Sequence, residues 1–204
     1  MKPIISAFML FMMFTATAFS QEEQRVLSDA DWEKIIPHLE SEQWGEVEKI
    51  SGGFLKKFDK EQENGIEAGM VRYMYLCGVG GLLGEKQINK DEAEKKVKSL
   101  KGKDIVTAGS VFRSKGMFNF FSYSEEEKKW NKCFANNDNT VIYLFEYYDM
   151  AHIAALTIGF MDSVEGKVLR LRGTIKDISA EGYAMPRLKV NYSNVEVWDV
   201  MEEE

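Results

Sequence analysis

Apolar residues recur with a helical period over residues 28–100. Trp32, Ile35 and Leu39 begin the first stripe at intervals of three and four residues, the spacing of one face of an α-helix. A Ser28-x-x-Asp31 sequence just ahead of them is a helix start signal. Two further stripes follow. The second consists of Trp44, Val47, Ser51, Phe54, Leu55 and Phe58, and the third of Ile66, Met70, Tyr73, Met74 and Cys77. A shorter fourth helix is expected to begin near Asn89 or Lys90 and to bury Ala93, Val97 and Leu100. The pattern predicts a helical domain over residues 28–103.

The first two predicted helices resemble a tetratricopeptide hairpin, because a tryptophan begins each stripe and the connection between them is short. No repeat of about 34 residues, the tetratricopeptide length, carries the pattern along the chain. Helices joined by short polar connections are expected to pack antiparallel. The pattern therefore indicates a helical hairpin bundle.

After Asp104 the apolar period changes to two, and β-branched and aromatic residues become frequent, which places a domain boundary at residues 101–103. The expected strands are 105–112, 117–123, 140–148, 167–178 and 188–198, with a short helix within 151–164. In the fourth strand alternate positions are apolar and polar, which predicts one buried and one solvated face. The solvated face would carry Arg170, Arg172, Thr174 and Lys176.

Five strands with a helix between the third and the fourth is the order of the OB-fold. Residues 102–111, with Gly102-Lys103 and Gly109, residues 165–175, with Gly166-Lys167 and Gly173, and the final strand at 190–197 resemble anticodon-binding-type OB domains. The resemblance implies an α+β protein whose residues 104–200 form a five-stranded β-barrel, with a binding face on the second and third strands. The chain departs from the nucleic-acid-binding pattern in its acidic charge and in an aromatic-rich, charged insertion at 124–139.

The first twenty residues have the pattern of a secretory signal peptide. Lys2 supplies a positive charge, residues 4–14 are almost continuously apolar, and Ala18-Phe19-Ser20 suits a signal peptidase. The apolar run is about half of the roughly 20 residues that a spanning helix needs. We expect cleavage after Ser20, a linker at 21–27, an acidic tail at 201–204, and a secreted or periplasmic protein without a membrane span.

The mature chain is acidic, since removal of the leader leaves 25 basic and 33 acidic residues, a net charge of −8. Such a charge repels phosphate backbones, which argues against nucleic acid as a partner.

Two cysteines, Cys77 and Cys133, lie in different predicted domains. In an oxidising compartment such a pair becomes a disulfide if the strict geometry of the bond is met. In the alternative, Cys77 is a buried thiol within an apolar helix and Cys133 is an unrelated strand residue. The sequence leaves both alternatives open.

No motif specifies catalysis, a metal or a cofactor. The glycine-rich run 78–84 has a helical stripe before it, where a dinucleotide fingerprint needs a strand. We interpret it either as small residues that let helices approach closely or as a helix end followed by a loop. His38 and His152 lack ligand-like spacing. No serine lies in a Gly-x-Ser-x-Gly elbow. Accordingly, no catalytic residue, metal ligand or cofactor is expected.

Aromatic residues are dense in the predicted barrel, and two pairs of them are adjacent in sequence. A regular strand would direct one ring of each pair outward. That ring would stack on a ligand or, if the helices cover the face, join a core between the domains. With the basic strand, the expected ligand or partner contacts are Phe120, Phe121, Tyr147, Tyr148, Arg170 and Arg172.

These patterns predict a non-catalytic binding or scaffolding protein of the cell envelope, whose partner is a protein, a peptide or a glycan. An enzyme with its site between the two domains is one alternative, and it would show polar groups converging in a deep pocket. Binding of single-stranded nucleic acid by the barrel is the other, and it needs a basic strip.

Overall fold

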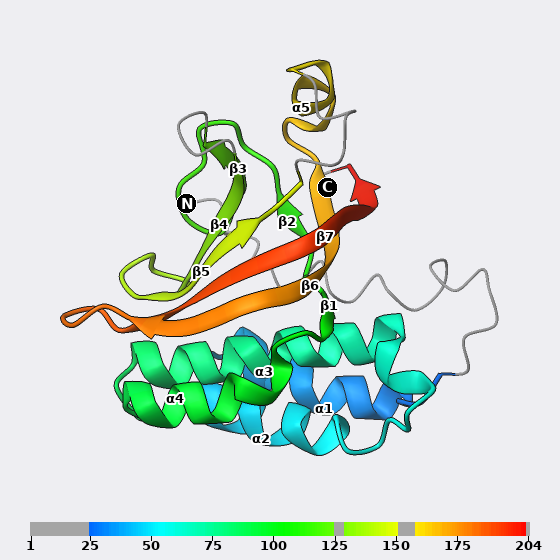
Figure 1. Cartoon of the computed structure of the whole chain (residues 1–204), viewed down its shortest axis with the longest axis vertical. Coiled ribbons are helices and arrows are strands. Elements are labelled where there is room, and N and C mark those ends of the chain that lie inside the picture. The colour runs from blue at the N-terminus through cyan, green and yellow to red at the C-terminus, as the bar shows by residue number, and fades with distance from the viewer. Residues whose placement is uncertain (1–24, 125–128, 151–157, 203–204) are drawn as a thin grey trace.

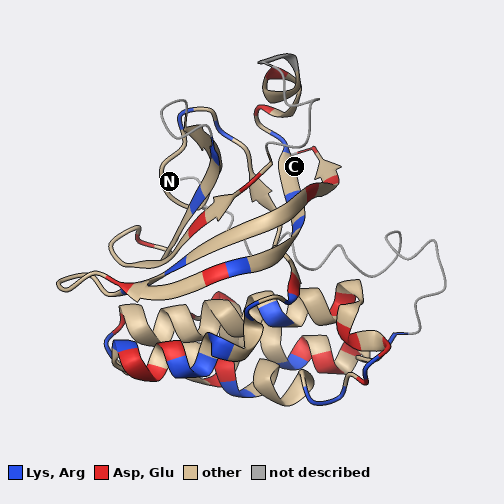
Figure 2. Ribbon diagram, in the orientation of Figure 1, with Lys and Arg blue, Asp and Glu red and all other residues tan. Residues whose placement is uncertain are grey.

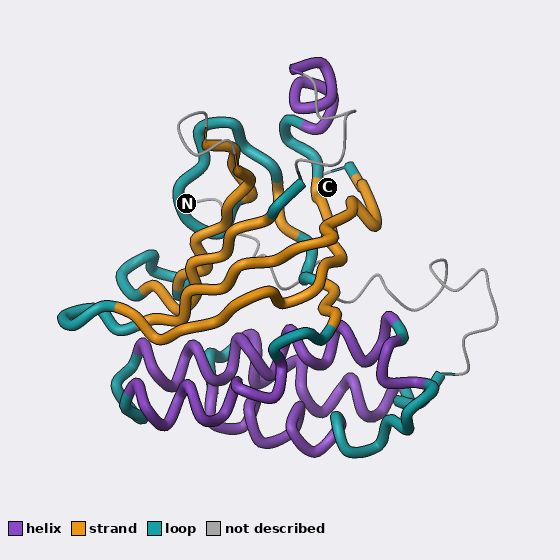
Figure 3. Tube along the Cα trace, viewed as in Figure 1, coloured by secondary structure: helices purple, strands orange, loops and turns teal. Residues whose placement is uncertain are grey.

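A computed structural model describes residues 25–124, 129–150 and 158–202. Its elements confirm the predicted mixture of helices and strands: a layer of helices packs against one face of a curled β-sheet (Figures 1 and 3). The signal peptide and most of the linker lie outside the described residues, as does the first part of the helix expected at 151–164. Export therefore stays a prediction.

Four helices form the first layer, and they begin where the sequence predicts. The bounds are α1 Asp29–Glu40, α2 Trp44–Phe54, α3 Ile66–Gly84 and α4 Lys90–Val97, with the short helices η2 Gln62–Asn64 and η3 Lys98–Leu100. At the start of α1, the Ser28 Oγ accepts a hydrogen bond from the Asp31 backbone N–H, and the Asp31 carboxylate accepts one from the Ser28 N–H, each at 3.2 Å. This capping box satisfies two N–H groups at the helix start.

Helix α3 is buried along almost its whole length, because α2 lies on one side of it and the sheet on the other. Its glycines make both contacts close. A Cβ on Gly78 would lie 2.7 Å from the backbone nitrogen of Glu48 in α2, and one on Gly80 would lie 2.6 Å from Leu144 Cδ2 in the sheet. The interpretation of this run as small packing residues is confirmed. Among the described residues, no helix has the length and apolar character needed to cross a membrane.

Within the described residues the sheet contains seven strands in the order β1-β6-β7-β5-β4-β3, with β2 paired to β6. The pairs are antiparallel, except that β5 runs parallel to β7. Helix α5 (Ile158–Val164) precedes β6 and lies far from the helical layer (Figure 1). The strands are β1 Asp104–Val106, β2 Ser110–Val111, β3 Phe121–Ser124, β4 Lys129–Ala135, β5 Ile142–Tyr148, β6 Val168–Glu181 and β7 Arg187–Met201.

The predicted five-stranded barrel is wrong, because the sheet has seven strands and is open. The first expected strand is divided into β1 and β2, and β4 lies within 124–139, where we expected an insertion. Helix α3 packs against β5 and β7, so their apolar face is covered without closure of the sheet. The closed barrel that the resemblance to OB domains implied is therefore absent from the described residues.

The helices and the sheet share one hydrophobic core. Val71 and Met74 of α3 belong to the same cluster of buried side chains as Leu144 of β5 and Val190 of β7. The change from helix to strand occurs between Leu100 and Asp104, where the sequence pattern changes. The two segments are therefore layers of one packed unit and have no separate cores.

Basic and acidic residues alternate in position along the ribbons of the helical layer (Figure 2). Some of them join neighbouring helices: Lys96 of α4 lies 2.9 Å from Glu48 of α2, and Lys57 lies 3.1 Å from Asp31 of α1. The acidic net charge is therefore dispersed over this layer instead of forming one strong field.

Candidate functional site

Five polar side chains meet between α3 and the inner face of the sheet, and we call them the buried polar cluster: Tyr73, Lys132, Glu146, Tyr148 and Tyr192. None is more than 3% exposed. Glu146 accepts hydrogen bonds from the hydroxyls of Tyr148, Tyr192 and Tyr73 at 2.9, 3.0 and 3.1 Å. The Tyr73 hydroxyl in turn accepts one from Lys132 Nζ at 3.2 Å. A single hydroxyl thus links the amine to the carboxyl.

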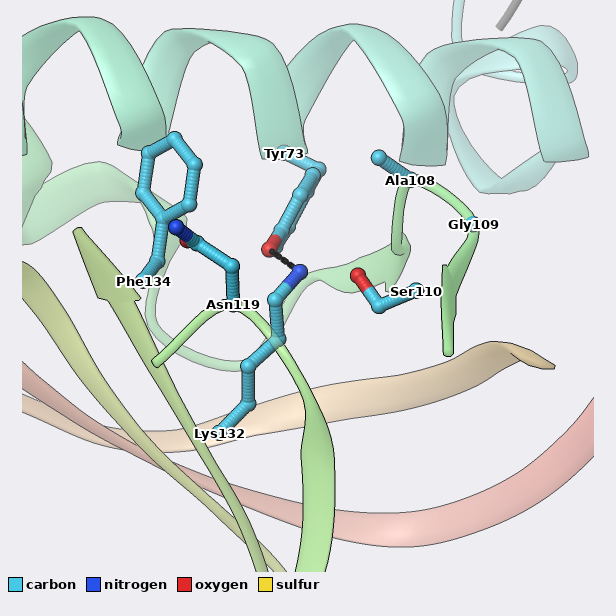
Figure 4. A pocket seen from close by; sticks show the side chains of 7 residues that line it. All are labelled: Tyr73, Ala108, Gly109, Ser110, Asn119, Lys132 and Phe134. Carbon is cyan, nitrogen blue, oxygen red and sulfur yellow. Dashed lines mark hydrogen bonds between the residues drawn. The ribbon is translucent and has the colours of Figure 1, made fainter. Parts of the chain in front are cut away.

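Strand register brings these groups together. Lys132 lies opposite Glu146 in the β4–β5 ladder, and Tyr148 lies opposite Tyr192 in the β5–β7 ladder. Side chains two residues apart share a face of a strand, so Glu146 and Tyr148 both point inward, and the Tyr73 hydroxyl reaches Glu146 from α3. Figure 4 shows Tyr73 extending from α3 to the amine of Lys132. The rings of Tyr148 and Tyr192 are stacked with centroids 4.8 Å apart.

Burial determines the protonation chemistry of the cluster. It lowers the pKa of Lys132 and raises the pKa of Glu146, while the attraction between the two groups opposes both shifts. It also holds the pKa of Tyr73, Tyr148 and Tyr192 well above the usual value, so these hydroxyls stay protonated donors at neutral pH. The cluster therefore joins a desolvated amine to a desolvated carboxyl through a neutral hydroxyl.

A small pocket of about 20 Å³ lies beside Lys132 Nζ (Figure 4). Ser110 is only 3% exposed, and its hydroxyl points into this pocket. This hydroxyl has no hydrogen-bond partner among the described residues. A space of this size holds about one water molecule or a group of a few atoms. The lining residues are Tyr73, Ala108, Gly109, Ser110, Asn119, Lys132 and Phe134.

A larger hollow, which we call the outer groove, lies across the sheet and has a volume of about 220 Å³. Its lining comes from β4, from β5 and the residue after it, from β7 and from β6, which are neighbours in the sheet. Tyr147 and Asn191 lie opposite each other in the β5–β7 ladder, on the face opposite Glu146, and both are half-buried. The lining residues are Lys129, Tyr147, Asp149, Lys176, Asp177, Asn191 and Tyr192.

The outer groove carries two lysines that are available to a ligand. Lys129 and Lys176 are exposed, and neither ammonium lies within 4.0 Å of a carboxylate among the described residues. Asp177, in contrast, lies 3.1 Å from Lys101. The groove therefore offers ammonium, amide and phenol donors together with carboxylate acceptors.

The adjacent aromatic residues divide between the two faces as the strand period predicts. Tyr148 is buried in the polar cluster, whereas Tyr147 lines the outer groove. Phe121 is also fully buried and meets the Tyr148 ring edge-on at 5.4 Å. Phe120 precedes β3, is half-buried, and packs against Gly116. Of the four candidate contacts, Tyr147 is the one placed in a hollow open to a ligand.

The predicted solvated basic face is wrong at Arg170, which is 2% exposed and lies 3.3 Å from Asp199. Arg172 remains 34% exposed but lies 3.5 Å from Asp104 and 4.0 Å from Glu196. The reason is the neighbouring strand: β7 places Asp199 opposite Arg170 and Glu196 opposite Arg172. These guanidinium groups hold the sheet together and do not form a strip for phosphates.

Both cysteines are free thiols in this structure and both are buried. Cys77 lies one turn after Tyr73 on α3, whereas Cys133 is adjacent to Lys132 on β4 and so points to the opposite face of that strand. The disulfide between them is therefore not formed here. Burial raises the pKa of Cys77, and it raises that of Cys133 to about 12.

We expect both thiols to react slowly with an aromatic disulfide reagent in the folded protein, because burial restricts access and suppresses the thiolate. At about pH 8 the native rate should be at least about 100-fold below the rate in denaturant. The reaction is followed with and without denaturant, and with no reductant present, which gives both the two rates and the number of thiols per chain. A count below two per chain would show that the cysteines are bonded in the purified protein.

Sequence reasoning did not single out Ser110, Lys132 or Glu146. A signal for Glu146 was present, because it is the one carboxylate within the otherwise apolar and aromatic strand at residues 142–148. A charge in such a position must be paired and hydrogen-bonded. No local signal marks its partner, since Lys132 lies in a segment rich in charged residues.

No protein-family model, no curated protein and no solved structure matches the chain. Function is therefore inferred from the chemistry of the two hollows.

Proposed function

We propose that this chain is an exported, non-catalytic binding protein that holds a glycan in the outer groove. The observation that carries the proposal is the position of the groove. It crosses four neighbouring strands on the sheet face opposite α3, and polar side chains and Tyr147 line it. The helices bury the inner face, so the outer face is the surface on which a large partner can lie.

The lining favours a hydroxyl-rich ligand over a peptide. Peptides that bind sheets usually add a strand to an exposed edge, where backbone groups lack partners. The outer groove lies over interior strands, whose backbone groups are already paired. Asn191, Lys129 and Lys176 can hydrogen-bond to sugar hydroxyls. Lys189 Nζ lies over one face of the Tyr147 ring, 5.5 Å from its centroid, so a sugar ring would pack on the other face or on the edge.

The two alternative functions have less support. Single-stranded nucleic acid requires a strip of free basic groups. Lys167 lies 3.0 Å from Glu202 and Lys189 lies 3.5 Å from Glu181, and Arg170 and Arg172 also have acidic partners. The exposed Lys129 and Lys176 share the outer groove with Asp149 and Asp177, whose carboxylates repel phosphates. An enzyme requires room for its substrate beside the converging polar groups. The pocket at Lys132, at about 20 Å³, admits only a few atoms.

Truncation of Tyr147 should weaken glycan binding by about tenfold, or about 1.4 kcal/mol, because contact between the ring and a sugar removes apolar surface from water at about 25 cal/mol per Å². Residues 21–204 would first be screened against a panel of envelope and extracellular glycans. The dissociation constant of the best ligand would then be measured by calorimetry for the wild type and for Tyr147→Ala.

The matched control is Tyr183→Ala, because Tyr183 is 99% exposed in the β6–β7 turn and lies outside the groove lining. This variant should bind as the wild type does. Equal losses in the two variants, or full affinity in Tyr147→Ala, would contradict the proposal. Selective capture of peptides, with no glycan bound, would show that the ligand class is wrong.

A further inference from the structure

The amine of Lys132 lies in surroundings that favour its uncharged, nucleophilic form. The rings of Tyr73, Phe121 and Phe134 lie 5.3–5.6 Å from Nζ and restrict the access of water. Burial lowers the pKa of this amine, although the nearby Glu146 opposes the shift. A desolvated lysine of this kind yields its proton more readily than a solvated one and can then act as a nucleophile.

The pocket beside the amine has a hydrogen-bond donor without an acceptor. Ser110 is 97% buried, and its hydroxyl faces the pocket with no partner among the described residues (Figure 4). The Ser110 oxygen is not sealed off by protein atoms, so a small occupant of the pocket can reach it and accept its hydrogen bond. The site is therefore suited to a small occupant that presents acceptor oxygens to Ser110 and lies within reach of Lys132.

A route for the proton is also in place. Lys132 Nζ donates to the Tyr73 hydroxyl at 3.2 Å, and this hydroxyl donates to Glu146 Oε2 at 3.1 Å. Glu146 can accept a proton because burial raises its pKa. Transfer along this chain would leave a neutral amine beside the pocket and a neutral carboxyl at Glu146.

We propose that Lys132 is a carboxylation site, at which its amine combines reversibly with carbon dioxide to form a carbamate. The Lys132 ammonium first passes one proton through Tyr73 to Glu146. The lone pair freed on the nitrogen then forms a bond to the carbon of carbon dioxide, and one carbon–oxygen π pair moves onto oxygen. The nitrogen finally releases a second proton to water at the pocket mouth. No electrons are exchanged with another reagent.

Carbon dioxide fits this site in both size and product chemistry. The pocket of about 20 Å³ has space for little more than one water-sized group, and carbon dioxide is among the smallest electrophiles that an amine can attack. The carbamate oxygens accept the hydrogen bond that Ser110 has to offer. Tyr73 can also donate to the carbamate once Glu146 is protonated and donates to Tyr73. The proposal does not rest on glycan binding in the outer groove.

The test is carbon-13 NMR of residues 21–204 with labelled bicarbonate. We expect a carbamate resonance at neutral pH in the wild type and in Lys115→Met, which removes an exposed lysine outside both hollows, and loss of that resonance in Lys132→Met. Ser110→Ala, which removes no hydrogen bond described in the structure, should keep the fold and reduce occupancy by about tenfold, since one hydrogen bond to a charged acceptor is lost. An absent resonance in the folded wild type would overturn the proposal, as would one that persists in Lys132→Met.

The pH profile separates this lysine from solvated ones. The titratable groups that face it are Tyr73 and Cys77 from α3, Glu146 and Tyr148 from β5, and Tyr192 from β7. Occupancy should rise with pH and reach half its maximum at a lower pH than carbamates of exposed lysines. A profile identical to that of the exposed lysines would show that the pocket does not promote the reaction.

Discussion

Replacement of Glu146 by alanine is expected to lower the free energy of unfolding by about 3–5 kcal/mol, the cost of removing one partner of a buried charge pair. The change leaves the amine of Lys132 without its acidic counterpart. It also removes the acceptor of three tyrosine hydroxyls inside the core. Urea unfolding followed by tryptophan fluorescence measures the effect, because Trp130 is buried in β4.

The control is Glu181→Ala, which removes a partly exposed carboxylate that lies 3.5 Å from Lys189 at the end of β6. Exposed pairs contribute at most about 1 kcal/mol, so this change should be nearly silent. The double variant Glu146→Gln, Lys132→Met should lose less free energy of unfolding than Glu146→Gln alone and Lys132→Met alone lose together, because no uncompensated charge remains in the double variant. A Glu146→Ala protein within about 0.5 kcal/mol of the wild type would show that the cluster is not a coupled network.

Gly81→Ala should be the most damaging single-methyl change in the helical layer. A Cβ at this position would lie 2.1–2.4 Å from three ring atoms of Trp44, which is itself packed edge-on against Tyr143 at 4.9 Å. Because Trp44 is 1% exposed and also contacts Phe134, either the ring must displace its neighbours or α2 and α3 must separate. We expect a loss of about 3 kcal/mol from overpacking, which exceeds the gain of up to about 1 kcal/mol in helix propensity.

Gly53→Ala is the matched control, since Gly53 lies in α2 and a Cβ there would meet nothing within 4 Å. That variant should be neutral or up to about 1 kcal/mol more stable. Thermal unfolding of both variants, followed by circular dichroism, compares them directly. Equal stability of the Gly81 and Gly53 variants would mean that α2 and α3 are not in close contact.

The helical layer could be predicted because each helix keeps a regular stripe and has local start signals. Ser28 and Asp31 form the predicted cap, and Ala93 and Val97 of α4 are buried as expected. The glycine run was also interpretable, because its residues follow a helical stripe directly. These features depend on neighbours in sequence, which is the information that a single sequence contains.

The sheet was predicted less well, because its arrangement depends on contacts between distant segments. Strand β4 was missed because Lys132 faces the core, and a lysine at an inward position breaks the expected alternation of apolar and polar residues. Arg170 was expected on the solvated face because it is charged, and only the register with β7 reveals that Asp199 lies beside it. The parallel pairing of β5 with β7, which brings Tyr147 next to Asn191, has no local signal.

The most direct measurement of the proposed function is an NMR titration of uniformly labelled residues 21–204 with the glycan selected by the screen. If the outer groove is the binding site, the largest shift changes should fall on Lys129, Tyr147, Lys176 and Asn191. The exposed hairpin tip at Tyr183 should be unaffected. Shift changes centred on the helical layer or on the hairpin tip, with the groove residues unmoved, would contradict the assignment of the outer groove as a glycan site.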